Sequence, residues 1–156
     1  METNSFKTLN SGICWDVAVV VRDLDSTVKR LEELGIGPFV LPEAPPGAEG
    51  LYYRGSPLES DYRALVARLG NMHLEIIQPD DKPNPWKEFL DTRGEGIHHI
   101  GFQVDDVDGE LNLLAGHDVE VPLIGKQNGK TGAAYVDLNV ANMVIELTSF
   151  NDVAEK

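Results

Sequence analysis

The feature that most constrains this chain is an internal repeat. Residues 16–34, DVAVVVRDLDSTVKRLEEL, and residues 99–117, HIGFQVDDVDGELNLLAGH, share one layout at a constant offset of 83 positions. Each copy starts with an apolar strand-like run headed by one polar residue, turns at an Asp-rich corner and continues with apolar residues at helical spacing. Because similar sequences form similar units, the repeat predicts two related modules, each built on a strand and a helix.

The acidic corner of each copy is interpreted as a helix start. The helices are predicted from apolar residues at helical spacing, which are Leu24, Val28, Leu31 and Leu34 in the first copy and Val107, Leu111 and Leu114 in the second. Asp23 or Asp25 would be the N-cap of the first helix, and Asp106 that of the second. These aspartates, together with Asp108, are therefore predicted to be caps rather than ligands.

Three further strand-like runs follow each predicted helix. They are 38–41, 62–69 and 72–78 in the first copy, and 119–124, 133–138 and 143–148 in the second. Each copy therefore has the order β-α-β-β-β, which predicts an α+β fold. Residues 42–57 hold four prolines and three glycines and are predicted to form a long inserted loop.

One domain is expected over residues 1–156, because the length suits a single core. Module one is placed at about 13–79, a connector at about 80–95, and module two at about 96–150. In the connector, Asn84 and Pro85 are predicted to be the N-cap and first residue of a short helix, Trp86 to Leu90.

The composition argues against several partners. The formal net charge is −13, from 13 basic and 26 acidic residues, and the basic residues form no cluster that would bind nucleic acid. No apolar run approaches the roughly 18 residues of a membrane span, and the first residues do not resemble a signal peptide. The single Cys14 agrees with a reducing compartment. We therefore expect a cytoplasmic protein with no nucleic-acid or membrane partner.

Alternation along the strands sorts their polar residues into two faces. His98 and His99 are neighbours, so they point to opposite sides, with His98 towards the helix layer and His99 away from it. By the same count Asp16, Glu75 and Glu146 each point away from the apolar face of their strand.

Two interpretations of this polar face are open. Asp16, Glu75 and Glu146 could be ordinary solvent-facing residues of half-exposed strands. Alternatively they converge with His99 in a partly buried cup. There, repulsion and desolvation would disfavour the charged carboxylates, and a divalent cation would remove that cost.

The repeated layout, together with GIHHIGFQVDD (96–106), HLEIIQP (73–79) and MVIELTSF (143–150), resembles the vicinal oxygen chelate superfamily. This family includes glyoxalase I, methylmalonyl-CoA epimerase, extradiol dioxygenases and bleomycin-resistance proteins. The resemblance covers about residues 13–149 and implies two modules that form a curved, U-shaped mixed sheet with helices on its outer face. It also makes a homodimer an option, since such folds often pair modules between chains.

The resemblance implies a metal site. The family's ligand positions, at the head of the first strand and within the last strand of each module, correspond to Asp16, Glu75, His99 and Glu146. The chain departs from the family at Asp16, where the epimerase and many glyoxalases have histidine. Three oxygen ligands and one nitrogen favour Mn²⁺, Co²⁺, Fe²⁺, Ni²⁺ or Mg²⁺, with Zn²⁺ as an alternative. His73 shares a face with Glu75 and could replace it or act beside it.

The resemblance further implies an enzyme, an isomerase, epimerase or lyase, that removes a proton next to a metal-bound carbonyl of a small metabolite. Glu59, which lies 16 residues before Glu75, is similar in placement to a glutamate of the epimerase and is a candidate base, or else a solvated loop residue. Glu146 is the second candidate base. Two other classes stay open: an extradiol-type dioxygenase, which needs two histidines and a carboxylate, and a non-catalytic binder of the bleomycin-resistance kind.

Overall fold

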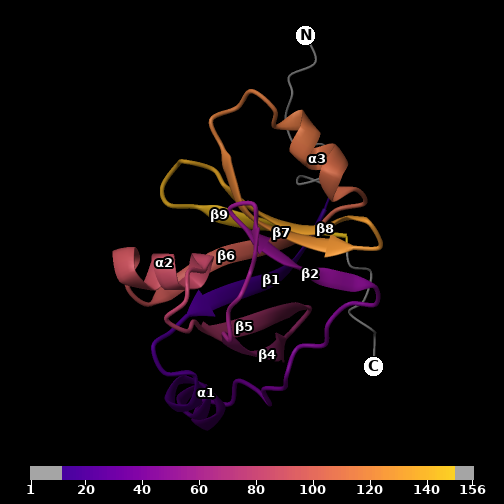
Figure 1. Ribbon diagram of the computed structural model, residues 1–156. Helices are drawn as coiled ribbons and strands as arrows, with labels where there is room; N and C mark the ends of the chain where they lie inside the picture. Colours follow the sequence, from indigo (N-terminus) through magenta and orange to yellow (C-terminus); the bar gives the residue numbers. More distant parts are fainter. Residues whose placement is uncertain (1–11, 150–156) are drawn as a thin grey trace. The chain divides into compact units, whose positions relative to one another are not determined.

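The computed structural model describes residues 12–149. Its elements in chain order are β1 (Ile13–Val20), α1 (Leu24–Glu33), β2 (Ala48–Tyr53), β3 (Ser56–Pro57), β4 (Arg63–Leu69), β5 (Met72–Gln78), α2 (Pro85–Arg93), β6 (Gly96–Gln103), α3 (Val107–Leu113), β7 (Glu120–Gln127), β8 (Lys130–Asp137) and β9 (Val144–Thr148) (Figure 1). The strands have the order β3-β2-β7-β8-β9-β6-β1-β5-β4 in one mixed sheet. The predicted α+β class is confirmed.

The chain packs as two compact units that do not coincide with the two sequence modules. Within the described residues, the β1 unit comprises 15–43 and 58–100, and the β8 unit comprises 12–14, 44–57 and 101–149. Residues 44–57 belong to module one by sequence, yet they pack with the strands of module two. No helix in the described part of the chain has the length and apolarity that crossing a membrane requires.

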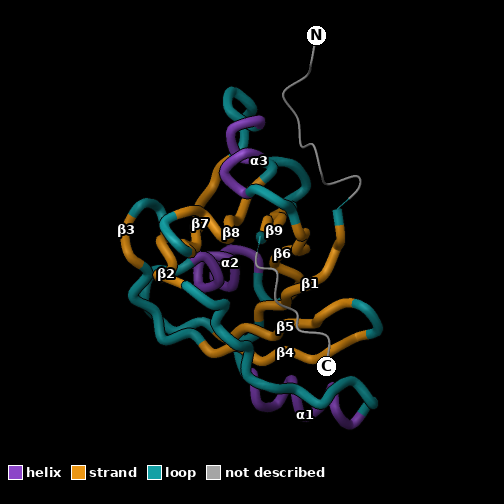
Figure 2. The backbone as a smooth tube through the Cα atoms, turned by 90° about the vertical axis from the view of Figure 1, so that its right-hand side faces the viewer, coloured by secondary structure: helices purple, strands orange, loops and turns teal. Residues whose placement is uncertain are grey.

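In the β1 unit, helix α1 packs on apolar residues of β1 and β5, and Figure 2 shows it beside β4 and β5. Asp23 is its N-cap, as predicted, and the carboxylate accepts a hydrogen bond of 3.0 Å from the backbone N–H of Ser26. The apolar side of the helix packs on the two strands in a core of Val19, Val21, Leu24, Val28, Leu31, Leu74 and Ile76. Alternate residues of β1 point towards this helix. The residues between them therefore point to the opposite face of the strand.

Asn84 ties the connector to the rest of the β1 unit. It is the N-cap of α2 and accepts a hydrogen bond from the backbone N–H of Lys87 at 2.7 Å, and Pro85 begins the helix as predicted. The helix continues to Arg93, past the predicted end at Leu90. The two N–H groups of the buried amide lie within hydrogen-bond distance of three acceptors, the Asp80 carboxylate at 3.0 Å, the Lys82 carbonyl at 2.8 Å and the Ser60 hydroxyl at 3.2 Å.

We expect Asn84→Ala to lower the free energy of unfolding by about 2 kcal/mol or more. The change removes the helix cap, which alone is worth about 0.5–2 kcal/mol, and leaves the partly buried carboxylate of Asp80 without one of its donors. Urea denaturation followed by circular dichroism measures the loss. Asn84→Ser keeps a cap acceptor, adds no charge beside Asp80 and loses the amide donors, so an equal loss in both variants would contradict the assigned role of the cap.

The β8 unit is built on antiparallel strands β7, β8 and β9, with β2 paired to β7. Helix α3 covers one face of these strands, over a core of Val104, Val107, Leu114, Ala134, Val136, Ile145 and Leu147. Glu146 lies between Ile145 and Leu147 on β9, so it projects to the face opposite α3. The cross-strand partner of Glu146 is Tyr135.

Two sequence expectations on strands are wrong. Residues 42–57 are not one long loop, because β2 and β3 lie within them, and Leu51 to Tyr53 pair with the edge of β7. Residues 38–41 do not form a strand, since only Val40 makes a bridge, to Val66. Pro38 and Pro42 flank that bridge and lack the backbone N–H that a longer ladder would need.

Candidate functional site

Asp16 lies on the buried face of β1 that points away from α1. It is 2% exposed, and its neighbours on this face, Ala18 and Val20, are fully buried. The strand places it there because Val19 and Val21, in the alternate register, pack against the helix. The predicted orientation is confirmed, and the solvent-facing interpretation is wrong for Asp16.

His99 lies on β6 and is 1% exposed. Its Nε2 atom is 3.4 Å from Oδ2 of Asp16, which also belongs to the β1 unit. The other oxygen, Oδ1 of Asp16, is buried and has no hydrogen-bond partner among residues 12–149. A buried carboxylate oxygen without a donor is costly, so this atom indicates that the site is built for a further group.

His98 lies directly beside this pair. Its Nδ1 atom is 2.8 Å from Nδ1 of His99, and its ring makes an edge contact with Phe89 of α2, with ring centroids 5.2 Å apart. Burial, with His99 and Arg93 close by, holds the pKa of His98 well below its usual value. The His98 imidazole is therefore neutral at pH 7.

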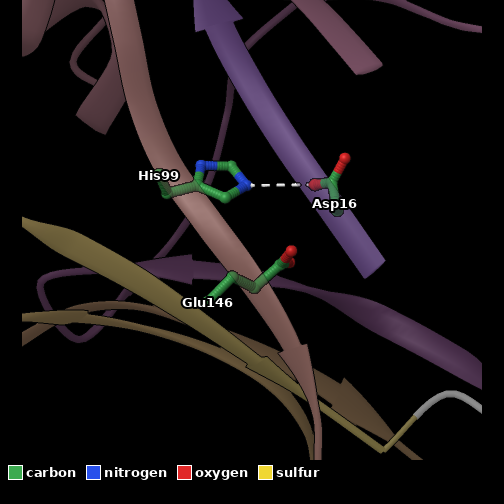
Figure 3. A group of neighbouring side chains, drawn as sticks. All are labelled: Asp16, His99 and Glu146. Atoms are coloured by element: carbon green, nitrogen blue, oxygen red, sulfur yellow. Dashed lines mark ion pairs between the residues drawn. The ribbon is translucent and has the colours of Figure 1, made fainter. Parts of the chain in front are cut away.

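Glu146 lies on β9 of the β8 unit, and its role as a ligand stays a prediction. Figure 3 shows the Asp16 and His99 side chains of the β1 unit, with a dashed line for the contact between them, and the Glu146 side chain. Two ligands about 2.1 Å from one ion, at angles of 90–109°, lie roughly 3.0–3.4 Å apart. The 3.4 Å between His99 and Asp16 matches this spacing. The donor chemistry and the Asp16 oxygen both fit a divalent cation.

Glu75, another predicted ligand, lies on β5. In the parallel pair of β1 and β5 the register sets Glu75 beside Ala18, while His73 is the partner of Asp16. Glu75 thus has the predicted face but is displaced along the strand by two residues from Asp16. The roles of Glu75 and His73 as ligands stay predictions.

Glu59, the first candidate base, is exposed between β3 and β4. Its charge contributes to the raised pKa of Lys82, for which the hydrogen bond from Lys82 to Asp61 is the main cause. The contact between His98 and His99 was not predicted from the sequence, which assigned the two side chains to opposite faces. The only signal was that two imidazoles are adjacent at the head of one strand.

Residues 16–136 match the sequence profile of the Glyoxalase/Bleomycin resistance protein/Dioxygenase superfamily. The chain belongs to this superfamily. The match spans more than half of the chain and includes Asp16 and His99. It confirms the resemblance inferred from the repeated modules and their strand motifs.

Individual proteins similar to this chain add a sequence comparison and a comparison of folds. The uncharacterized protein YqjC of Bacillus subtilis (strain 168) is 28% identical over 130 residues, which cover 77% of this chain and 91% of YqjC. Methylmalonyl-CoA epimerase from Mycobacterium tuberculosis superposes with a TM-score of 0.62 at 20% identity, covering 95% of this chain and 91% of the epimerase.

A mutant of 4-hydroxymandelate synthase from Streptomyces coelicolor superposes with a TM-score of 0.54 at 16% identity, covering 90% of this chain and 52% of that chain. Proteins named for two different reactions thus share this fold with the chain. The reaction must therefore be argued from the side chains of the site.

Proposed function

We propose that this superfamily member is a cation-dependent isomerase, epimerase or lyase that removes a proton from the carbon next to a carbonyl of a small metabolite. The observation that carries the proposal is the buried pair of Asp16 and His99, with one Asp16 oxygen lacking a donor among the described residues. A purely structural ion pair would not leave that oxygen unsatisfied. Asp16, His99 and Glu146 would hold the cation, with Glu75 as a further candidate ligand.

A bound divalent cation would supply an electrophile that stabilises negative charge on the substrate carbonyl oxygen. The protein's own contribution is the base. Glu146 would accept the proton as the C–H bond breaks and its electron pair moves towards the carbonyl. Return of a proton to the other side of that carbon would give epimerisation, and its return to a neighbouring atom would give isomerisation.

Burial of the site supports this division of roles. Asp16 and His99 are almost fully enclosed, whereas Glu146 is only half-buried. A half-buried carboxylate retains the freedom to move between holding and releasing a proton. Asp16 and His99 are fixed, which suits ligands.

The neighbours named as epimerases support the carbonyl class of substrate. One of them is described in complex with methylmalonyl-CoA, a thioester with an acidic C–H bond. The single histidine among the four predicted ligands favours this chemistry over ring cleavage by the two-histidine, one-carboxylate iron centre. His73, the register partner of Asp16, is the residue that could complete such a centre.

The proposal is tested with protein purified without chelator. Elemental analysis is expected to find bound divalent metal, or titration calorimetry to find binding of Mn²⁺ or Co²⁺ by the metal-free chain. Incubation with 2-substituted malonyl thioesters and 2-hydroxy ketones in D₂O is expected to exchange the proton next to the carbonyl, measured as loss of its NMR signal.

Three outcomes separate the function classes. Cation-dependent exchange under anaerobic conditions supports the proposal. Oxygen consumption with a catechol and Fe²⁺ would assign the chain to the dioxygenases instead. Absence of cation binding and of exchange, with tight binding of an apolar ligand, would indicate a non-catalytic binding protein.

A further inference from the structure

The contact between His98 and His99 requires a defined arrangement of protons. Adjacent strand residues normally point apart, yet the two Nδ1 atoms lie 2.8 Å from each other. At this distance one nitrogen must carry a proton and the other a lone pair. The protonation of one ring therefore sets the tautomer of the other.

The place of Asp16 decides the direction of this hydrogen bond once a cation is present. Nε2 of His99 is the nitrogen that faces Asp16, at 3.4 Å, so Nε2 is the atom available as a ligand. A ligating nitrogen must offer its lone pair, which leaves the ring proton on Nδ1. That proton then points at Nδ1 of His98, which is the acceptor at 2.8 Å.

We propose that His98 is a positioning residue, which accepts the Nδ1–H of His99 and thereby holds Nε2 of His99 ready for a divalent cation. Metal-bound histidines usually donate this proton to a carboxylate, a carbonyl or water. Here a second, neutral imidazole takes that place. That a cation binds here rests on the proposed function. That His98 is the hydrogen-bond partner of His99 rests on the contacts within the β1 unit.

The surroundings of His98 hold it in this role. Its ring is 5% exposed and that of His99 is 1% exposed, so water has little access to replace the acceptor. Phe89 packs edge-on against the His98 ring with an interplanar angle of 74°, and Arg93 in turn lies over Phe89 with 5.6 Å from its guanidinium carbon to the ring centroid. Helix α2 thus fixes the orientation of the imidazole that the site uses.

Three variants of the full chain test the role by calorimetric titration with Zn²⁺. His98→Phe keeps the ring volume and removes the acceptor, and it is expected to weaken binding 10–100-fold, the usual cost of losing such a partner. His98→Asn places an oxygen where Nδ1 was and is expected to stay within about threefold of wild type. Phe89→Leu keeps the acceptor but loosens the packing that orients it, so it is expected to weaken binding less than His98→Phe does.

Nitrogen-15 NMR of the Zn²⁺-loaded wild type gives a second readout. It reports the positions of the ring protons, which a role of His98 in packing alone would not determine. His99 is expected to carry its proton on Nδ1 and His98 on Nε2. The reverse arrangement in the wild type would overturn the proposal, even if His98→Phe does not fold.

Equal Zn²⁺ affinity in wild type and His98→Phe would also overturn it, while leaving the proposed function intact. Failure of the wild type to bind Zn²⁺, Mn²⁺ or Co²⁺ at all would overturn both. The two failures are therefore distinguishable.

Discussion

Asp16→Asn is expected to reduce divalent-cation affinity at least 100-fold while leaving the protein folded. The side chain is 2% exposed, and the amide removes a full negative charge from beside the ion, where little water screens it. The amide has nearly the same shape as the carboxylate, so the packing around this position is expected to be preserved.

Thermal unfolding with and without chelator measures the loss of cation affinity as a loss of stabilisation by the cation. At a free cation concentration of about 1,000 times Kd, binding stabilises the wild type by roughly 4 kcal/mol, or about 8–16 °C in Tm for a chain of this size. With a Kd 100-fold weaker, the Asp16→Asn protein would keep only about 1.4 kcal/mol of this stabilisation, so its difference in Tm is expected to be about a third of the wild-type difference or less. Because ligands must be deprotonated to bind metal, the wild-type difference is expected to shrink as the pH falls towards 4.

Asp25→Asn is the matched control, since it removes the same charge from an exposed carboxylate. The Asp25 side chain is 72% exposed and pairs with Arg63 on the surface of the β1 unit. The hydrogen bond from Arg63 lowers the pKa of Asp25, but the group lies outside the buried face of β1. Equal loss of cation binding in both variants would point to a general charge effect and contradict a specific site at Asp16.

The positions of Asp16 and His99 could be predicted because strand alternation has a fixed period of two. Once the apolar side of a strand is assigned to the helix layer, every other residue follows, and both residues have the predicted orientation. The position of a side chain along its strand, relative to residues of the neighbouring strand, is a different quantity. It depends on the register between β1 and β5, which sets Glu75 beside Ala18 rather than Asp16, and a single sequence does not specify that register.

The error over residues 42–57 has a related cause. Prolines and glycines report local backbone preference, and they correctly mark turns such as Gly47, whose φ is +75°. The strand β2 inside this stretch forms because its backbone groups pair with β7, for example Tyr53 with Leu123, some 70 positions away. Pairing over such a distance leaves no local signal beyond the strand-forming residues Leu51 to Tyr53.

Glu146→Gln is expected to lower the rate of cation-dependent proton exchange by about 10³-fold, with a much smaller loss of cation affinity. Glutamine matches the shape of glutamate but cannot accept a proton, and a positioned base contributes roughly 10²–10⁴-fold. If Glu146 were only a ligand, the exchange rate at saturating cation would recover in the variant. The deciding measurement is therefore the loss of exchange rate at saturating cation compared with the loss of cation affinity.

Two further variants identify the base. Glu120→Gln makes the same chemical change on β7, at a side chain that is 60% exposed and close to Arg54, and is expected to leave exchange unchanged. Glu59→Gln tests the other candidate, which is exposed in the loop before β4. A loss of exchange in Glu59→Gln but not in Glu146→Gln would assign the base to Glu59 and restrict Glu146 to holding the cation. Comparable losses in both would indicate two bases, one for each face of the substrate carbon.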